Sequence, residues 1–362
     1  PLLKEFHTYL LRQYREKRNL DDLIDSELPA GSKGQEGSPS TALPAGLSGR
    51  GIENVASSTA LPAGLSGRGA EISAPGGARL RPETAPGSGS PRWSWADRSD
   101  GLYTGHNVHP VCSLRYDWTG WPTAGTVLPP ETADVARTTA VEWKADGLSL
   151  LEQHATAEKV QLLFDVTVHI SPVFFAQRVK GRLQHSLRAA GKPADFSRKV
   201  AFRSLGENTS LKVREYVGKQ VGKADFADPR FRETMRRFTV IPEKGRLDDP
   251  LESNSGRYWY NLHVVLVAAK RFRITNPVKL GEIRDAALRL AEEAGYRIAA
   301  LSVMPDHTHI SVRGKIEDSP EKIALAFQNG LARAVGCRAW QDEYYVGTFS
   351  EYELDVIRRI VG

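Results

Sequence analysis

Apolar and polar positions along the later two thirds of the chain change period in short segments, which predicts alternating strands and helices. The first group of elements runs strand, helix, strand, helix, extended segment and helix: Cys112–Trp118, Glu131–Lys144, Lys159–Val168, Pro172–Leu187, Phe196–Ser204, and a helix that begins near Thr209 or Ser210 and includes Leu211–Val221. Proline opens the fourth element and Gly191 follows it, as is typical of helices.

The second group repeats this order. Its elements are Tyr258–Ala268 (strand), Val278–Gly295 (helix), Tyr296–Val312 (β-rich), Ser319–Gly336 (helix), Trp340–Phe349 (extended) and Glu353–Gly362 (helix). Short strings also agree: HisIleSer occurs at 169–171 and 309–311, and ValArgGluTyrValGly at 213–218 resembles IleArgArgIleValGly at 357–362. These observations indicate an internal duplication of a small α+β unit, with an antiparallel-rich sheet and helices packed on it.

The duplication divides the 362 residues into five segments. We expect a first α+β domain at 92–222, a charged and proline-containing linker at 223–256, and a second domain at 257–362. Residues 1–30 read as a charged helix. Residues 31–91 read as a flexible linker, because glycine, serine and proline are abundant there and burial cannot offset the ordering entropy. This linker contains the string STALPAGLSGRG twice, at 40–51 and 58–69.

Composition narrows the class of protein without fixing it. A net charge of +6 favours a polyanionic partner. Two cysteines, Cys112 and Cys337, exclude a disulfide scaffold and a four-cysteine zinc site. The cysteine usage and the lack of a long apolar run or a secretory segment predict a cytoplasmic location with no membrane span.

Two groups of residues carry candidate chemistry. His307 and His309 lie in the string MetProAspHisThrHis, and on a strand they would project from one face, as two imidazole ligands of a divalent metal do. Tyr216 and Gln220 are four residues apart on the predicted helix and would share a face. A tyrosine hydroxyl can attack a phosphodiester, and a glutamine oxygen can ligate a metal.

Together these motifs resemble the HUH single-tyrosine transposases, including those associated with repetitive extragenic palindromes, over about residues 112–362. The resemblance implies two ferredoxin-like domains that act on single-stranded DNA next to hairpins. It also implies that His307, His309 and Gln220 hold Mg²⁺ or Mn²⁺, and that Tyr216 forms a 5′-phosphotyrosine intermediate during DNA cleavage and strand transfer.

Each half departs from the family pattern. The second half has Ile360 where the tyrosine is expected. In the first half, alignment of the HisIleSer strings places Thr167 opposite His307 and leaves His169 opposite His309. In many members of the family two subunits exchange their closing helices. The resemblance therefore implies one composite site, in which Tyr216 and Gln220 from the first half complete His307 and His309 of the second. The chain would then be a monomeric pseudo-dimer with a dead mirror site.

A basic run in the first half favours contact with DNA phosphates. Its members are Arg178, Lys180, Arg182, Arg188, Arg198, Lys199 and Arg203. Three alternatives stay open: Tyr352 as a substitute nucleophile, a domesticated protein that binds DNA hairpins without cleaving them, and a metal-independent 2H phosphoesterase in which His169 and His309 both act.

Overall fold

The computed structural model describes residues 102–351, except 225, 227–228, 244 and 246, together with the short strand β1 (Arg18–Asn19). β1 pairs in parallel with β11 (Phe272–Arg273). Residues 18 and 19 are therefore strand and not part of the predicted charged helix. The remainder of that helix, the 31–91 segment and the closing helix predicted at Glu353–Gly362 lie outside the described residues.

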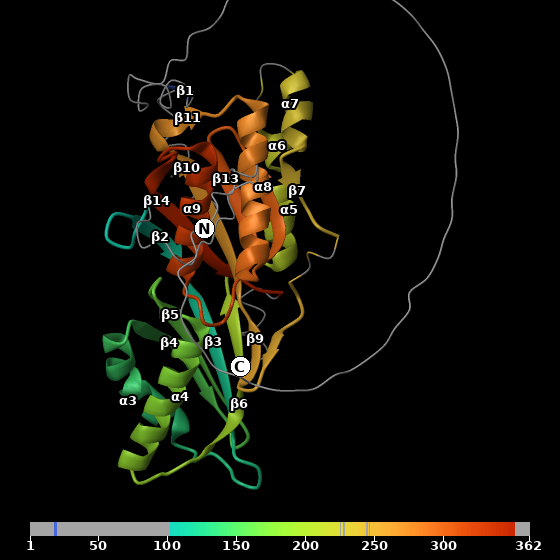
Figure 1. The fold of residues 1–362 in the computed structure, drawn as a ribbon. Coiled ribbons are helices and arrows are strands. Elements are labelled where there is room, and N and C mark those ends of the chain that lie inside the picture. Colours follow the sequence, from blue (N-terminus) through green and yellow to red (C-terminus); the bar gives the residue numbers. More distant parts are fainter. Residues whose placement is uncertain are drawn as a thin grey trace, which may run out of the picture. The chain divides into compact units, whose positions relative to one another are not determined.

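The first α+β unit follows the order β3–α3–β4–β5–α4–β6 (Figure 1). Its elements are β3 (Arg115–Pro122), α3 (Thr132–Ala145), β4 (Leu148–Ala155), β5 (Val160–Val166), α4 (Pro172–Ala189) and β6 (Phe196–Leu205). The strands are antiparallel in the order β4-β5-β3-β6. This is the ferredoxin-like arrangement. β4 is an element that the sequence patterns missed.

The second unit has the same order. It consists of β10 (Asn261–Ala268), α8 (Pro277–Ala294), β12 (Arg297–Val303), β13 (His307–Arg313), α9 (Pro320–Val335) and β14 (Trp340–Phe349). Its strand order, β14-β10-β13-β12, is equivalent to that of the first unit, and these pairings are also antiparallel. The predicted α+β class with two ferredoxin-like domains is confirmed.

Each sheet is extended by a strand that precedes the first strand of the other unit. β2 (His109–Ser113) pairs in parallel with β14, and β9 (Gly256–Trp259) pairs in parallel with β6. Two hydrogen bonds repeat this exchange: Arg115 N–H donates to Thr348 Oγ1 at 2.9 Å, and Asn261 N–H donates to Ser204 Oγ at 2.9 Å. The two units are thus related by an internal pseudo-symmetry, and Arg115 and Asn261 are equivalent positions.

The segment between the units carries structure of its own. After α5 (Ser210–Gly218) and α6 (Gln220–Lys223) come α7 (Pro229–Arg236), β7 (Thr239–Val240) and β8 (Leu251–Ser253). β7 joins the second sheet beside β12, and β8 joins the first beside β9. Met235 and Phe238 are buried in the core.

Local sequence fixes the helix ends. Side chains of Ser171, Asn276 and Ser319 cap α4, α8 and α9, and each is followed by proline at the first helical position. Gly295 and Gly336 end α8 and α9 in the left-handed conformation that glycine adopts without strain.

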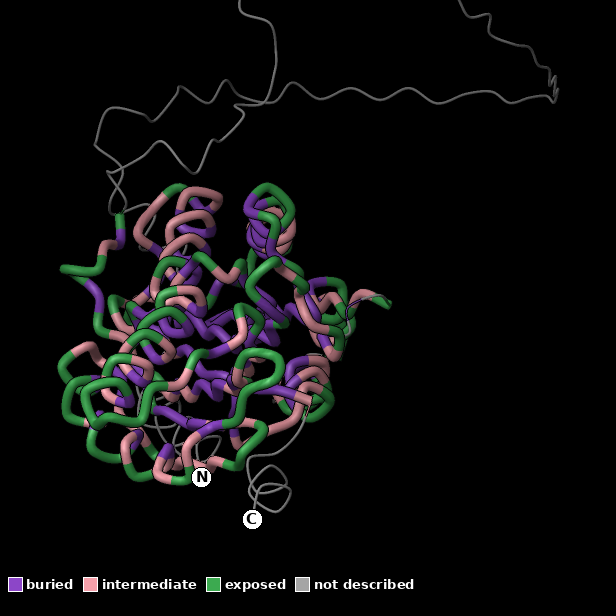
Figure 2. Tube along the Cα trace, turned by 90° about the horizontal axis from the view of Figure 1, so that it is seen from below, coloured by how far each residue is buried: buried purple, intermediate pink, exposed green. Residues whose placement is uncertain are grey.

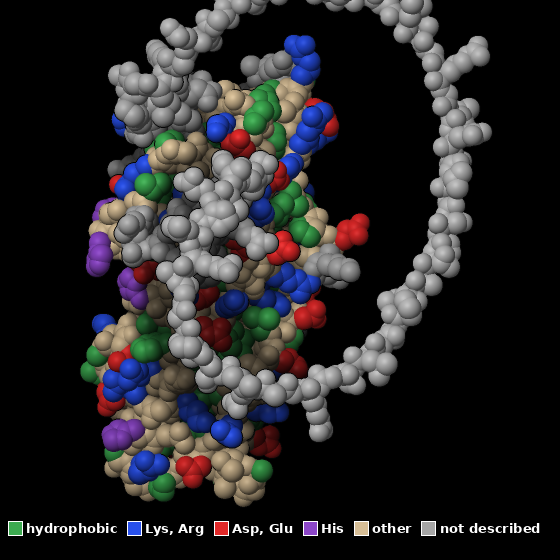
Figure 3. Space-filling view, in the orientation of Figure 1, with side chains coloured by type: hydrophobic (Ala, Val, Ile, Leu, Met, Phe, Trp, Pro, Cys, Tyr) green, Lys and Arg blue, Asp and Glu red, His purple; other side chains and the backbone are tan. Residues whose placement is uncertain are grey.

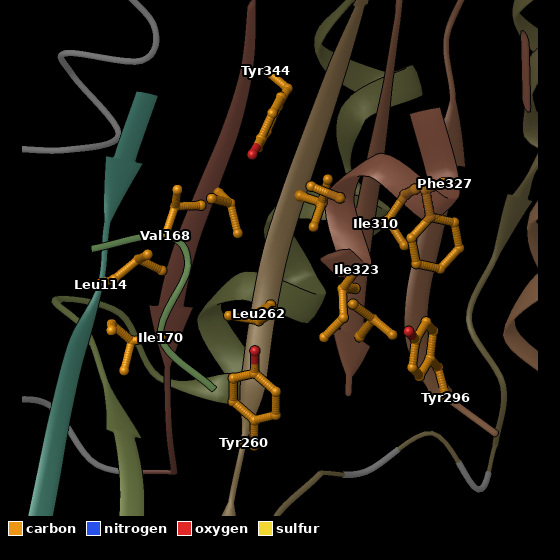
Figure 4. Close-up of a cluster of buried hydrophobic side chains, with 14 of the residues drawn as sticks. Leu114, Val168, Ile170, Tyr260, Leu262, Tyr296, Ile310, Ile323, Phe327 and Tyr344 are labelled. Carbon is orange, nitrogen blue, oxygen red and sulfur yellow. The ribbon is translucent and has the colours of Figure 1, made fainter. Parts of the chain in front are cut away.

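One apolar core extends through both units. Figure 4 shows Leu114 and Ile170 of the first unit in the same cluster as Leu262, Ile310 and Phe327 of the second. Figure 2 shows buried chain mainly in the interior and exposed chain mainly at the periphery. Within the described residues, no helix has the length and apolar character of a membrane span.

Candidate active site

The two histidines of the MetProAspHisThrHis string lie on β13 and point to one face of the second sheet. His309 is fully buried and His307 is 6% exposed. Their rings are perpendicular with centroids 4.8 Å apart. In the antiparallel register His307 stands opposite Val267, and His309 stands opposite Val265 of β10. The strand spacing predicted from the sequence is therefore present.

Tyr216 reaches this face from α5, the closing helix of the first unit. Thr209 caps the helix, and its apolar residues Val213 and Val217 pack with Ala300 and Phe349 of the second unit. This packing places the Tyr216 ring 5.5 Å from the His309 ring, centroid to centroid and perpendicular to it. The structure thus brings together the tyrosine of one half and the histidines of the other.

Gln220 begins the short helix α6, directly after the break at Lys219. Its side-chain amide donates to the Tyr216 carbonyl oxygen at 2.9 Å, and the residue is buried. Since the amide nitrogen is engaged in this bond, the side-chain oxygen is the atom with lone pairs that a cation can use.

The tyrosine hydroxyl lies in a partly desolvated environment. Burial raises the pKa of Tyr216, and a hydrogen bond from Gln220 opposes that shift. The ammonium group of Lys223 lies 4.1 Å from the centroid of the tyrosine ring. The sequence analysis did not identify Lys223 as a candidate residue, although it follows Tyr216 and Gln220 at helical spacing.

A third histidine, which sequence reasoning also missed, joins the pair from the neighbouring strand. His263 on β10 stacks on His309 with ring centroids 5.3 Å apart, and His263 Nε2 lies 3.1 Å from His309 Nδ1. Burial lowers the pKa of His263 to about 4. Burial also lowers the pKa of His309, together with the nearby His307, His263 and Lys223. The imidazoles of His263 and His309 are therefore neutral near pH 7.

Asp306, which directly precedes His307 in the MetProAspHisThrHis string, contacts the ring of that histidine. His307 Nδ1 is 2.7 Å from Asp306 Oδ1, and Arg271 Nη1 donates to Asp306 Oδ2 at 2.8 Å. Burial favours a raised pKa for Asp306, but His307 and Arg271 overcome this effect and lower the pKa to about 2. Asp306 therefore stays ionised between two donors.

The donor set suits a small metal site with two protein imidazoles. His307 Nε2 is buried and has no hydrogen-bond partner among the described residues. Within the same residues, no group of three or more His, Cys, Asp or Glu side chains could hold a metal ion. A cation here would therefore depend on the two histidines, the Gln220 oxygen and oxygens from substrate or water.

The equivalent face of the first sheet has different chemistry. In the strand register, Arg115 of β3 faces Asp165 of β5, and its equivalent Asn261 of β10 faces Arg313 of β13. Counting back along β5 and β13 from these partners makes Gln161 equivalent to His309. The same count makes Lys159, directly before β5, equivalent to His307. The alignment through HisIleSer, which paired Thr167 with His307 and His169 with His309, is wrong because His169 lies in the loop after β5.

The basic run of the first unit is partly neutralised by acids that are distant in sequence. Arg182 bonds to Asp146 and Glu142 of the α3 region, Arg178 lies 3.6 Å from Asp146, and Arg203 pairs with Glu351. Lys180 donates to the Ser197 carbonyl oxygen. Arg188, Arg198 and Lys199 are exposed. Figure 3 shows basic and acidic side chains interspersed on the face in view.

Comparison with known proteins gives one family. Residues 257–361 match the family described as "Transposase IS200 like". The resemblance inferred from the sequence is confirmed for this part of the chain. No curated protein matches. One similar solved structure is titled "Structure of the REP associates tyrosine transposase bound to a REP hairpin"; it has 15% identity and a TM-score of 0.23, and the match covers 28% of this chain and 62% of that chain. The match thus spans less than two thirds of that protein.

Proposed function

We propose, from the membership of residues 257–361 in the IS200-like transposase family, that this chain cleaves single-stranded DNA beside a hairpin through one composite active site. Tyr216 is the nucleophile, and His307, His309 and Gln220 hold Mg²⁺ or Mn²⁺. Strand transfer follows when a DNA 3′-hydroxyl reverses the attack.

The observation that carries the proposal is the contact of Tyr216 with His309. The two residues come from different copies of a duplicated unit, and each copy holds only part of the family's motif. Their ring centroids are 5.5 Å apart, because α5 of the first unit packs on the second sheet. A helix that served only to cover this sheet would not require a tyrosine beside the histidine pair.

The chemistry of the step follows from the groups around the phenol. The Tyr216 Oη–H bond breaks, with its proton passing to water, as a bond forms from Oη to the scissile phosphorus and the bond from phosphorus to the DNA 3′-oxygen breaks. The departing 3′-oxygen takes a proton from water and becomes a hydroxyl, so the 5′-phosphate remains on the protein and no net proton is lost or gained. The ammonium group of Lys223 stabilises the phenolate that develops during attack.

The histidine pair prepares the site for a divalent cation. When bound, the cation polarises the phosphate and stabilises its developing charge. The buried and unpartnered His307 Nε2 supports this assignment. Ligation of a neutral imidazole needs no proton release, which suits the lowered pKa of His309.

DNA contacts are proposed for the basic residues of α4 and β6. Arg188, Arg198 and Lys199 are exposed and suited to phosphate contacts. Arg178, Lys180, Arg182 and Arg203 would bind DNA only by exchanging contacts that they make in the protein. The hairpin preference belongs to this proposal and rests on the family.

The metal-independent 2H phosphoesterase is disfavoured by the strand register. His309 is buried beside Tyr216, whereas His169 is in a loop and contacts Glu321 at 2.8 Å. The two HisIleSer strings thus occupy positions that are not equivalent, whereas a two-lobed active site of that class requires equivalent positions.

A covalent-trapping experiment tests the proposal. The full chain is incubated with single-stranded hairpin DNA and Mn²⁺, and the adduct is located by peptide mass spectrometry. We expect one DNA adduct per chain, on Tyr216, that is lost in Tyr216→Phe and retained in Tyr352→Phe. Specific hairpin binding without any adduct would instead favour the domesticated binding protein, and an adduct on Tyr352 would move the nucleophile into the second half.

A further inference from the structure

The two histidines of the site are each held at Nδ1 by a different partner. Asp306 Oδ1 lies 2.7 Å from His307 Nδ1, and His263 Nε2 lies 3.1 Å from His309 Nδ1. Both partners are more than nine tenths buried, so water competes poorly for either hydrogen bond. A neutral imidazole has one donor nitrogen and one acceptor nitrogen, so the partner at Nδ1 decides the state of Nε2.

From this geometry we propose that Asp306, with Arg271 behind it, and His263 are positioning residues that fix both histidines with Nε2 as the cation ligand. The inference rests on the proposed function, because it concerns the same site. Asp306 accepts a hydrogen bond from His307 Nδ1. His263 accepts a hydrogen bond from His309 Nδ1 and keeps its own proton on Nδ1.

The Asp306 carboxylate, which bonds to His307, is itself held in place by a buried ion pair with Arg271. Arg271 is 4% exposed and binds the second oxygen of Asp306 at 2.8 Å. Lys270 and Arg271 have φ angles of 48° and 57°, a region that non-glycine residues rarely adopt. Backbone strain persists where surrounding contacts hold it, and it is frequent at functional sites. In addition, the Ile274 and Ala268 N–H groups donate to the Pro305 and Asp306 carbonyls, tying this segment to the turn before β13.

The hydrogen bond from His309 to the neutral His263 should affect its histidine less than the bond from His307 to the Asp306 carboxylate does. A carboxylate partner makes a histidine a more basic ligand, whereas a neutral imidazole orients the ring with less effect on its basicity. His307 is accordingly the stronger ligand of the two. The first unit has a hydrogen bond at the equivalent positions without imidazoles: Gln161 Nε2 donates to Asp117 Oδ1 at 2.9 Å, where the second unit has His309 and His263. Asp117→Asn keeps an acceptor there and is a matched control.

The test is direct Mn²⁺ binding to the full chain, measured by electron paramagnetic resonance of the free ion. We expect His307→Ala to abolish binding, and His263→Phe and Asp306→Asn each to weaken it by about 10- to 100-fold. His263→Gln, which retains an acceptor, should recover part of the affinity. Asp117→Asn should bind Mn²⁺ as the wild type does. Thermal melting establishes that each variant is folded.

A second measurement separates positioning from general destabilisation. Nitrogen-15 NMR of histidine-labelled protein without metal should show His307 and His309 protonated at Nδ1, and His263→Phe should shift only His309 toward the other tautomer. Wild-type affinity in folded His263→Phe and Asp306→Asn, with binding still lost in His307→Ala, would overturn the positioning roles and leave the proposed function intact. No Mn²⁺ binding by the wild type, or unchanged binding in His307→Ala, would contradict the proposed metal site itself.

Discussion

The two units share a fold and differ in their side chains at three equivalent positions. The second unit has His263, His309 and His307, where the first has Asp117 on β3, Gln161 on β5 and Lys159 directly before β5. A hydrogen bond between the first and third strands is present in both units, from Gln161 to Asp117 and between His263 and His309. The fold thus accepts either set of side chains at these positions, and the two sheet faces differ in the chemical groups that they present.

Burial disfavours the charged form of the side chain in both units, but the charged form is an anion at Asp117 and a cation at His263. It raises the pKa of Asp117 to about 6, although Gln161 and Arg203 oppose that shift, and it lowers the pKa of His263 to about 4. In each case the neutral form is favoured. The two sites should therefore respond to acid in opposite directions.

The largest effect on the rate of adduct formation is expected when His309 of the second unit is replaced by glutamine, the residue at the equivalent position of the first unit. His309→Gln should lower the rate of adduct formation by about 10²- to 10³-fold, since one electrostatic contributor to phosphate activation is lost. The fold should tolerate glutamine, as the first sheet does at Gln161. Single-turnover gel assays measure the rate, and His169→Ala is the control expected to react normally. A His309→Gln chain of full activity would refute the assigned role.

Acidification should destabilise the protein through His263. The unfolded histidine titrates near pH 6.5 and the folded one near pH 4, so the contribution is present above pH 6.5 and is lost as pH falls toward 4. The loss approaches about 3 kcal/mol at pH 4. Urea unfolding at pH 7 and pH 4.5 should show a smaller decrease in His263→Phe than in the wild type. Equal decreases would show that His263 is not the residue responsible.

Asp117 should have the opposite dependence. Its folded pKa lies above the unfolded value, so its contribution is fully present below about pH 4 and is lost as pH rises through 6. Asp117→Asn should therefore raise the free energy of unfolding at pH 8 by about 2 to 3 kcal/mol and change it little at pH 4. Denaturant unfolding at both pH values measures this difference, and a variant less stable at pH 8 would contradict it.

A smaller effect is expected at Lys223. Lys223→Met removes the ammonium beside Tyr216 and should slow adduct formation by about tenfold, the scale of a partly desolvated cation–π contact. Lys219 is the control, because it pairs with Glu215 on the exposed side of α5. Lys223→Arg should recover part of the rate. Equal rates for the Lys219→Met and Lys223→Met variants would remove Lys223 from the mechanism.

The smallest effects concern DNA affinity in the first unit. Replacing Arg198 by alanine should weaken DNA binding at all sequences and reduce the slope of log K against log salt by about 1. Arg182→Ala should change the slope less, because Arg182 already pairs with Asp146 and Glu142. Binding titrations at several salt concentrations compare the two, and a larger slope change for Arg182→Ala would reverse this assignment.

The sequence predicted the relative placement of those candidate residues whose positions depend on local spacing. His307 and His309 follow from a two-residue strand period, and Tyr216 and Gln220 follow from a helical one. β4 was missed because its string, LeuSerLeuLeuGluGlnHisAla, lacks a clear alternation of apolar and polar residues. The helix α3 that precedes it was predicted within one residue of its bounds.

Contacts between distant segments could not be predicted in this way. His263 reaches His309 only because of the register between β10 and β13. Arg271 reaches Asp306, 35 residues later in the sequence, because the segment after β10 is bonded to the turn before β13. The pairing of Arg182 with Glu142 and Asp146 likewise depends on the packing of α4 against α3. A short identical string such as HisIleSer was a poor guide to equivalence, since backbone register follows strand pairing and not local identity.

A complementation experiment tests the composite site most directly. Tyr216→Phe and His307→Ala chains are assayed separately and as an equimolar mixture, with hairpin DNA and Mn²⁺, beside the wild type. Because α5 packs on the second sheet of its own chain, we expect an adduct with the wild type and none with either variant or the mixture. An adduct in the mixture would show that the tyrosine and the histidines act between chains and would contradict a single-chain site.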